Sequence, residues 1–348
     1  MPIAFDSLAD IYAASFDDLI DVRSPAEFAE DHVPGAINLP ALSNEERAKV
    51  GTIYTQVSPF KARKIGAALV ARNAADHIEG PLAAHDGAWQ PLVYCWRGGQ
   101  RSGSFASILQ QIGWRAETLK GGYQSYRRLV VAMLHDSALP HRLVVLDGNT
   151  GTAKTELLHR ACAQGAQILD LEGLANHRGS LFGAMPGGQP AQKGFESRIA
   201  EKLTALDPAR PTLVEAESSK VGELIVPPAL WKAMCAAPRI TVAAPLQARA
   251  RYLTQAYCDM LEDPARLAAT LEQLIRFQGR EQVAAWTALA QQGAYETLAA
   301  ELMERHYDRR YGKSRADKPQ ERLAEIALGA MDSADLDRAA AAICNATK

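Results

Sequence analysis

The segment at residues 91–104, PLVYCWRGGQRSGS, combines a cysteine with residue types that stabilise negative charge. A short apolar run leads into Cys95, and the glycines that follow permit a backbone path that turns successive N–H groups inward. A thiol at the base of such a loop has a lowered pKa and is a nucleophile. A buried structural cysteine would not need two neighbouring arginines. We therefore interpret Cys95 as catalytic, with an oxyanion held by Arg97, Gly98, Gly99 and Arg101.

A second glycine-rich segment, GNTGTAKT at residues 148–155, lies between a predicted strand at 143–146 and a predicted helix. This order is typical of a phosphate-binding loop, whose backbone N–H groups and helix N-terminus face an anion. The Thr155 hydroxyl is a candidate Mg²⁺ ligand. Ala153 replaces the second glycine of the usual pattern, so a positive φ there would strain the loop by about 1 kcal/mol. The candidate diphosphate-binding residues are Gly148, Asn149, Thr150, Gly151, Thr152, Lys154 and Thr155.

Acidic and polar residues follow two more predicted strands, at residues 167–169 and 211–215. Because the carboxyl ends of parallel strands meet at one edge of a sheet, we expect these residues to lie near the phosphate loop. A lone histidine is usually structural, but His177 stands in a polar loop, which favours a functional role. Glu215 is a second candidate Mg²⁺ ligand. The supporting residues are Asp170, Glu172, His177, Arg178, Glu215 and Glu217.

The order of predicted elements indicates an α/β protein with two domains, at residues 1–137 and 138–348. Pro140 marks the boundary, within a linker predicted at 135–144. We expect Asp21 and Arg23 to form a structural ion pair at the end of a strand. In the first domain we predict strands at 19–22, 36–39 and 116–119 and helices at 26–30, 61–72 and 104–112, with a surface excursion at 73–90. Everything after about residue 260 is predicted to be helical.

Composition excludes several classes of protein. The chain has 348 residues, with 38 Lys and Arg against 40 Asp and Glu, so its formal net charge of -2 offers no overall basic field for nucleic acid. The five cysteines lack metal-ligand spacing, and we expect reduced thiols in a soluble, cytoplasmic protein without a membrane span. Any nucleic acid must therefore bind a local patch, for which the candidates are Arg305, Arg309, Arg310, Lys313 and Arg315.

Three segments, DVRSPAEFAEDHVPGAINLP, YCWRGGQRSG and LKGGYQSYR, resemble a rhodanese domain from about residue 8 to residue 134. The resemblance implies chalcogen transfer through Cys95. The spacing from Cys95 to Arg101 is also that of cysteine phosphatases, which leaves a phosphatase as a rival interpretation. Against it, Tyr94 stands where such enzymes commonly have a histidine, and the loop contains no acidic residue to serve as general acid.

The further order of phosphate loop, DLEGLANHRGSLFG, VEAESSKVG and HYDRRYGKS resembles the tRNA 2-selenouridine synthases, over about residues 8–315. This implies a rhodanese-like domain before a P-loop NTPase-like domain with a helical C-terminal part. The implied reaction converts wobble 2-thiouridine of tRNA to 2-selenouridine through S-geranyl-2-thiouridine. Geranyl diphosphate and selenophosphate are the implied co-substrates, with no tightly bound cofactor, and a selenophosphate-producing enzyme is an implied partner. An ATP-dependent sulfurtransferase or kinase and a non-enzymatic tRNA-binding adaptor stay open.

Overall fold

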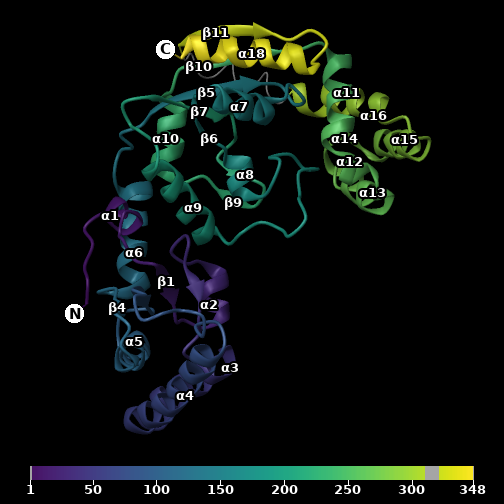
Figure 1. Cartoon of the computed structure of the whole chain (residues 1–348). Coiled ribbons are helices and arrows are strands. Elements are labelled where there is room, and N and C mark those ends of the chain that lie inside the picture. Colours follow the sequence, from purple (N-terminus) through teal and green to yellow (C-terminus); the bar gives the residue numbers. More distant parts are fainter. Residues whose placement is uncertain (1, 310–320, 348) are drawn as a thin grey trace. The chain divides into compact units, whose positions relative to one another are not determined.

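The structure is a computed structural model that describes residues 2–309 and 321–347 (Figure 1). The chain divides into two compact units. The first comprises residues 1–137 and 190–205, and the second comprises residues 138–189 and 206–348. Each unit is described separately below. In the described part of the chain, no helix is both long enough and apolar enough to cross a lipid bilayer.

The first unit contains a parallel sheet with the strand order β2 (Ile37–Asn38), β1 (Asp18–Asp21), β3 (Pro91–Tyr94) and β4 (Glu117–Thr118). Its helices include α1 (Leu8–Tyr12), α2 (Pro25–Glu30), α5 (Gln100–Ile112) and α6 (Gly122–Val131). All four residues of β3 are buried, because the strand lies inside the sheet and its side chains pack on both faces. The core around it includes Ile20, Val22, Val93, Phe105 and Leu109. The predicted strands at 19–22, 36–39 and 116–119 and the predicted helices at 26–30 and 104–112 are confirmed to within a few residues.

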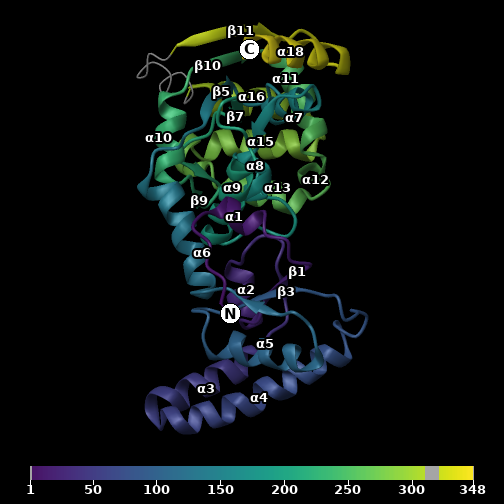
Figure 2. The same ribbon diagram turned by 60° about the vertical axis from the view of Figure 1, so that its left-hand side comes forward.

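A helical hairpin, α3 (Asn44–Gln56) and α4 (Pro59–Glu79), extends from this sheet (Figure 2). The predicted helix at 61–72 is therefore too short, and the surface excursion predicted to begin at residue 73 is wrong for its first seven residues. Continuation of α4 buries Ala74 beside Val70, and Asn73 donates a hydrogen bond to the backbone oxygen of Ala41 at 3.0 Å. Tertiary contacts thus extend a helix whose sequence turns polar at this point.

Helix α9 (Gln192–Thr204) belongs to the first unit although it follows part of the second unit in the sequence. It packs against α1, α6 and the π-helical turn η1 (Ala132–Asp136). Phe195, Ile199 and Leu203 are fully buried there, at the i, i+4, i+8 spacing of one helix face. Glu196 on the same helix forms an ion pair with Arg127 of α6. The first unit is therefore completed by a segment distant in sequence.

The second unit contains a parallel sheet with the strand order β11 (Arg322–Ala327), β10 (Arg239–Ala243), β5 (Arg142–Gly148), β7 (Pro211–Glu215) and β6 (Gln167–Leu169). Helices α7 (Lys154–Ala163) and α18 (Ser333–Ala346) pack together, and residues of both share a core with the sheet (Figure 1). The phosphate loop connects β5 to α7, and α8 (Leu171–Ala175) follows β6 directly. The carboxyl ends of β5, β6 and β7 thus supply all the predicted polar residues of this unit.

Helices after the sheet strands form a second cluster in this unit, seen together in green in Figure 1. Their shared core includes Met260, Leu267, Leu271, Trp286 and Leu298. The helices are α11 (Leu246–Ala256), α12 (Cys258–Leu261), α13 (Pro264–Glu272), α14 (Ile275–Gln278), α15 (Arg280–Gln291), α16 (Tyr295–Leu302) and the π-helical turn η2 (Met303–Tyr307). The remaining elements are α10 (Pro228–Ala236) and the hairpin β8 (Lys220–Val221) and β9 (Leu224–Ile225).

The prediction that everything beyond residue 260 is helical is wrong at β11. Its sequence, RLAEIA, contains alanines and opposite charges that favour a helix on intrinsic propensity. It nevertheless pairs in parallel with β10 at the edge of the sheet, where Ile326 is buried against the core. Context decides the conformation of such short segments, because strand propensity reflects packing more than backbone preference.

Candidate functional site

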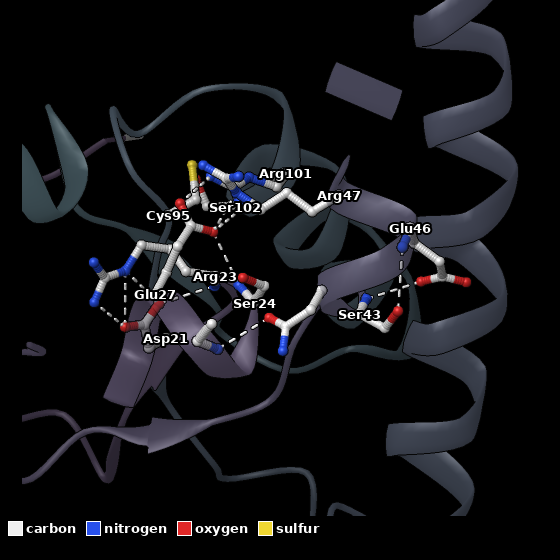
Figure 3. Close-up of polar contacts among 12 residues, drawn as sticks. Asp21, Arg23, Ser24, Glu27, Ser43, Glu46, Arg47, Cys95, Arg101 and Ser102 are labelled. Atoms are coloured by element: carbon white, nitrogen blue, oxygen red, sulfur yellow. Dashed lines mark hydrogen bonds and ion pairs between the residues drawn. The ribbon is translucent and has the colours of Figure 1, made fainter. Parts of the chain in front are cut away.

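Cys95 lies immediately after β3, at the base of a loop that leads into α5 (Figure 3). Its sulfur accepts hydrogen bonds from the backbone N–H of Gly99 at 3.3 Å and from the Ser102 hydroxyl at 3.2 Å. Burial raises the pKa of the thiol, but the Ser102 and Gly99 hydrogen bonds and the Arg101 charge outweigh it, so the pKa of Cys95 is lowered. The loop thus stabilises a thiolate, as the sequence predicts. Ser102 was not among the predicted site residues.

Ser102→Ala is expected to raise the pKa of the Cys95 thiol. Removing the hydroxyl takes away the largest of the interactions that lower this pKa, while burial still raises it, so the thiolate is less stabilised. The rate of Cys95 alkylation by iodoacetamide, measured against pH by peptide mass spectrometry, should therefore reach half its maximum at a higher pH than in the unchanged protein. Ser104→Ala is the matched control, because Ser104 is exposed on the same helix. An unshifted profile for Ser102→Ala would refute this role.

Close backbone packing shapes the Cys95 loop. Gly98 has φ +65°, and a Cβ there would lie 2.6 Å from the Leu119 carbonyl oxygen. Gly122 has φ +57°, and a Cβ there would lie 2.2 Å from the Cys95 carbonyl oxygen, which accepts a hydrogen bond from Tyr123 N at 2.8 Å. Gly99 has φ -106° and open space around it, so the expectation that both loop glycines are needed for their backbone angles is correct only for Gly98.

Gly98→Ala should destabilise the protein by at least about 2 kcal/mol, since it adds left-handed strain to a backbone clash. Gly99→Ala adds the same methyl group at the next residue, where no heavy atom lies within 4 Å of it, and should change stability little. Chemical denaturation of both variants measures the difference. Equal midpoints would show that the loop does not require the observed conformation at residue 98.

The two loop arginines differ in their surroundings. Arg101 forms an ion pair with Glu27 at 2.8 Å, and Glu27 also contacts Arg47 at 3.0 Å (Figure 3). Burial raises the pKa of Glu27, but the Arg101 contact outweighs it and lowers that pKa to about 2. Arg97 is exposed beside the loop. Arg101 is thus fixed in place by a carboxylate that sequence reasoning missed, whereas Arg97 can move toward an incoming anion.

Buried polar residues pack next to the Cys95 loop. Arg23 and Asp21 form an ion pair at 2.6 Å with almost no exposure, as expected from their positions at the strand end. The Arg23 guanidinium also lies 3.9 Å from the centre of the Tyr123 ring. The Tyr94 hydroxyl is fully buried and accepts a hydrogen bond from Val33 N at 3.1 Å. The Tyr94 hydroxyl is therefore engaged with the backbone at Val33.

The predicted phosphate loop of the second unit has the expected strand, loop and helix geometry. Ala153 has φ 56°, in the left-handed region, so this position does favour the glycine of the usual pattern. Lys154 Nζ donates a hydrogen bond to the Gly148 carbonyl oxygen at 3.1 Å, and Thr152 Oγ1 donates to Asn149 O at 2.9 Å. The loop is therefore closed on itself by its own side chains.

A cavity of about 440 Å³ lies over this loop, entirely within the second unit. It is large enough for a small phosphorylated molecule. Of the predicted residues, those that line it are Thr150, Gly151, Lys154, Thr155, Asp170, Glu172, His177, Arg178 and Glu217. Gly148, Asn149, Thr152 and Glu215 are not among the lining residues. Residues that sequence reasoning did not identify, including Glu156, Tyr252 and Tyr257, also line it.

Carboxylates gather at one side of this cavity. The Thr155 hydroxyl donates to Glu172 Oε2 at 2.7 Å, and Glu172 N donates to Glu215 Oε1 at 2.8 Å. Glu215 is fully buried behind the cavity, and burial followed by the charges of Asp170 and Glu172 raises its pKa well above the usual range. Burial and the Glu172 charge raise the pKa of Glu217 to about 8. The cavity therefore holds acidic groups that repel one another.

His177 and Arg178 place nitrogen donors and positive charge at the same cavity. His177 Nδ1 accepts a hydrogen bond from Gly179 N at 3.1 Å, and burial lowers the pKa of this histidine, so its ring is neutral at pH 7. Arg178 is held by an ion pair to Asp259 at 2.8 Å and lies 4.8 Å from the centre of the Tyr257 ring. His177 is thus part of the cavity wall, as the polar loop around it indicates.

Comparison with known proteins gives a match for each of the two domains. A family model described as a rhodanese-like domain matches residues 5–129, and one described as the tRNA 2-selenouridine synthase AAA domain matches residues 141–279. The tRNA 2-selenouridine synthase of Psychromonas ingrahamii is 37% identical over 73% of this chain and 69% of its own length. The chain belongs to the tRNA 2-selenouridine synthase family. The synthases of Aeromonas salmonicida and Nitrosomonas europaea are 37% and 34% identical, over 69% and 78% of this chain and 64% and 71% of theirs.

The chain thus spans about two thirds of the length of the curated synthases that it matches. As the sequence predicts for this family, an N-terminal rhodanese domain precedes a second parallel-sheet domain with helices toward the C-terminus. One helix of that domain contacts the phosphate loop directly. Arg249 of α11 donates to the Thr150 carbonyl oxygen at 3.1 Å and pairs with Asp308 at 2.8 Å, whereas Arg251 is exposed.

The basic residues proposed for nucleic-acid contact are only partly described by the structure. Arg305 donates to Gln282 at 2.8 Å and lies 3.6 Å from Glu301, so its charge is partly compensated. Arg309 is exposed at the end of the described helical segment. Arg310, Lys313 and Arg315 lie outside the described residues. The prediction that this segment contacts tRNA phosphates stays a prediction.

Proposed function

We propose that this chain converts wobble 2-thiouridine of tRNA to 2-selenouridine in two stages, with an S-geranyl intermediate. The observation that carries the proposal is that one chain contains two distinct sites, one in each unit. One is a loop that stabilises a thiolate at Cys95, and the other is a phosphate-loop cavity lined by Lys154 and Thr155. Each site suits one stage. Family membership supports the overall reaction, and the geometry supports this division of labour.

In the first stage, the sulfur of 2-thiouridine attacks carbon 1 of geranyl diphosphate. A carbon–sulfur bond forms, the carbon–oxygen bond to diphosphate breaks, diphosphate departs with the electron pair, and the base loses its N3 proton to water. The backbone donors of the loop 148–155, the helix N-terminus of α7 and the Lys154 ammonium stabilise the negative charge that develops on diphosphate. Arg178 at the cavity wall adds a further positive charge. Alkylation makes the sulfur a better leaving group.

The donor set fits a magnesium ion at this site. Thr155, Glu172 and Glu217 present hard oxygen ligands at one cavity, and the Thr155 hydroxyl already contacts Glu172. Glu215, the carboxylate predicted with Thr155, contacts Glu172 N instead and would act from behind it. In the described part of the chain, no three or more His, Cys, Asp and Glu side chains are already arranged around a metal position. Magnesium would supply charge neutralisation for diphosphate.

In the second stage, selenium from selenophosphate replaces the alkylated sulfur. A carbon–selenium bond forms at C2 of the base, the carbon–sulfur bond breaks, and sulfur leaves as geranylthiol. The Cys95 thiolate displaces selenium from phosphorus, and water then cleaves the resulting sulfur–phosphorus bond to yield phosphate and the free thiol. We assign this stage to the Cys95 loop, in which Gly99 N, the N-terminus of α5 and the loop arginines suit a phosphate-sized oxyanion beside the thiolate. Arg97 and Arg101 are the proposed anion-binding side chains.

The rival activities fit the geometry less well. A cysteine phosphatase needs a general acid to protonate the departing alkoxide, and the residues of the Cys95 loop include none. An ATP-dependent kinase needs close closure of the loop on a triphosphate, which the left-handed Ala153 and its Cβ oppose. A leaving diphosphate requires charge and N–H donors but less exact closure. The first argument disfavours a phosphatase at the Cys95 loop, and the second favours alkyl transfer over ATP hydrolysis at the phosphate loop.

An omission experiment tests the proposed function. The intact protein is incubated with 2-thiouridine tRNA, geranyl diphosphate and selenophosphate, and each component is left out in turn before the nucleosides are read by mass spectrometry. We expect S-geranyl-2-thiouridine without selenophosphate, and no 2-selenouridine without geranyl diphosphate. Formation of 2-selenouridine in the absence of geranyl diphosphate, or a requirement for ATP, would refute the proposal.

A further inference from the structure

A second cavity of the second unit is not explained by the residues considered so far. It has a volume of about 80 Å³ and shares Thr150, Ser180, Leu253, Tyr257 and Tyr307 with the phosphate-loop cavity. Because the two cavities share these lining residues, they are adjacent, and rotation of the shared side chains would let a molecule bound at the phosphate loop reach the second cavity. Thr150 belongs to the loop itself, so the second cavity begins where a bound diphosphate would end.

The chemistry of the second cavity is opposite to that of the first. Its other walls come from Phe182 and from residues of α11, α12, α13, α16 and η2, and none of the described residues that line it carries a charge. Met260, Leu267, Leu298, Leu302 and Met303 are each at most 8% exposed. A narrow space of this kind suits a thin acyclic chain, and the unbranched methionine side chains can adjust to it. It does not suit a nucleotide ring.

We propose that this apolar cavity binds the hydrocarbon chain of an allylic diphosphate whose diphosphate group lies at the phosphate loop. The inference rests on the proposed function and assigns the part of the site that sequence reasoning could not place. A charged cavity joined to an apolar one matches a molecule with a charged head and an apolar tail. Each methylene group removed from water into the second cavity adds affinity for the longer chain.

One face of α16 determines how much of the chain fits. Tyr295, Leu298, Ala299 and Leu302 all line the cavity, at the i, i+3, i+4 and i+7 spacing of a single helix face. Ala299 has the smallest side chain on this face. A larger side chain at this position would occupy the space in which the distal carbons of the chain lie. Ala299 is therefore the proposed determinant of chain length.

The test compares three ligands by titration calorimetry on the intact protein: inorganic diphosphate, dimethylallyl diphosphate and geranyl diphosphate. In the unchanged protein we expect geranyl diphosphate to bind most tightly. Ala299→Phe should weaken geranyl diphosphate binding by about tenfold or more and leave diphosphate binding unchanged. Thr297→Phe is the matched control, because it adds the same bulk at an exposed position of α16 and should behave like the unchanged protein. Ala299→Leu provides a smaller change should the phenylalanine variant fail to fold.

The outcomes separate this inference from the proposed function. If the unchanged protein geranylates 2-thiouridine tRNA and prefers geranyl diphosphate, but both Ala299 variants retain that preference, the cavity assignment is wrong and the proposed function stands. If the unchanged protein does not distinguish geranyl diphosphate from inorganic diphosphate, both are wrong. Selective loss of geranyl diphosphate affinity in the Ala299 variants, with Thr297→Phe unaffected, supports the assignment.

Discussion

Lys154→Ala is expected to reduce geranyl transfer to 2-thiouridine tRNA by about a hundredfold to a thousandfold, the range typical of losing one group that stabilises transition-state charge. Lys154 lines the phosphate-loop cavity, and its ammonium group is already placed beside the loop carbonyl of Gly148. Without it, negative charge on the departing diphosphate is less stabilised. Formation of 2-selenouridine should fail as a consequence. Nucleoside mass spectrometry measures both products in one sample.

The same variant should still convert tRNA that is supplied already S-geranylated, because the second stage does not use the phosphate loop. Lys232→Ala is the matched control, since Lys232 is an exposed lysine of α10 in the same unit. Circular dichroism checks that the loss of the Lys154 contact to Gly148 leaves the fold intact. The assignment would be contradicted if Lys154→Ala formed no 2-selenouridine from S-geranylated tRNA, or formed as much from 2-thiouridine tRNA as from S-geranylated tRNA. Strong ATP turnover that disappears in this variant would favour an ATP-dependent enzyme instead.

Cys95→Ala is expected to abolish 2-selenouridine formation while leaving S-geranyl-2-thiouridine to accumulate. The thiolate of Cys95 is stabilised by Ser102 and Gly99 in the first unit, whereas the residues proposed for alkyl transfer all line a cavity of the second unit. Removing the sulfur therefore stops one stage only. The alanine variant leaves the Gly99 N–H and the Ser102 hydroxyl without this acceptor, so Cys95→Ser is a second variant that keeps an acceptor atom in place.

Cys162→Ala is the matched control for Cys95. Cys162 is an exposed free cysteine of α7 and lines neither of the cavities described above. This variant should form 2-selenouridine at the normal rate. Normal 2-selenouridine formation by both Cys95 variants would eliminate a role for the thiol, and loss of S-geranylation in them would show that the two stages are not separable.

Much of the fold follows from local sequence patterns because the relevant elements are short, strongly apolar and bounded by turn residues. The strand that leads to Cys95 is fully buried, and the strand that leads to the phosphate loop is buried after Arg142 and contains the apolar run Leu143 to Leu146. Two features could not be derived in this way. Strand β11 is held by pairing with β10, and α9 packs with a unit from which it is separated in sequence. Both depend on long-range contacts that leave no local pattern.

The candidate sites likewise combine residues that local patterns predict with residues that only long-range contacts bring to the site. Motifs place Cys95 at the end of a strand and Lys154 and Glu172 beside the phosphate loop, as the structure has them, because strand ends and glycine-rich turns dictate where such residues can lie. The partners that tune them come from elsewhere in the chain. Glu27 fixes Arg101 from α2, and Arg249 contacts the phosphate loop from α11. The apolar walls of the second cavity resemble any amphipathic helix face in sequence, so only the packed structure distinguishes them from an ordinary core.

The central claim is that one chain performs two separable stages, and a sequential experiment with two inactive variants tests it most directly. Cys95→Ala protein is first incubated with 2-thiouridine tRNA and geranyl diphosphate, and the tRNA is then repurified and given to Lys154→Ala protein with selenophosphate. We predict that 2-selenouridine appears after the second incubation although neither variant forms it from 2-thiouridine tRNA alone. The absence of 2-selenouridine, when the first incubation has yielded S-geranylated tRNA, would contradict the account.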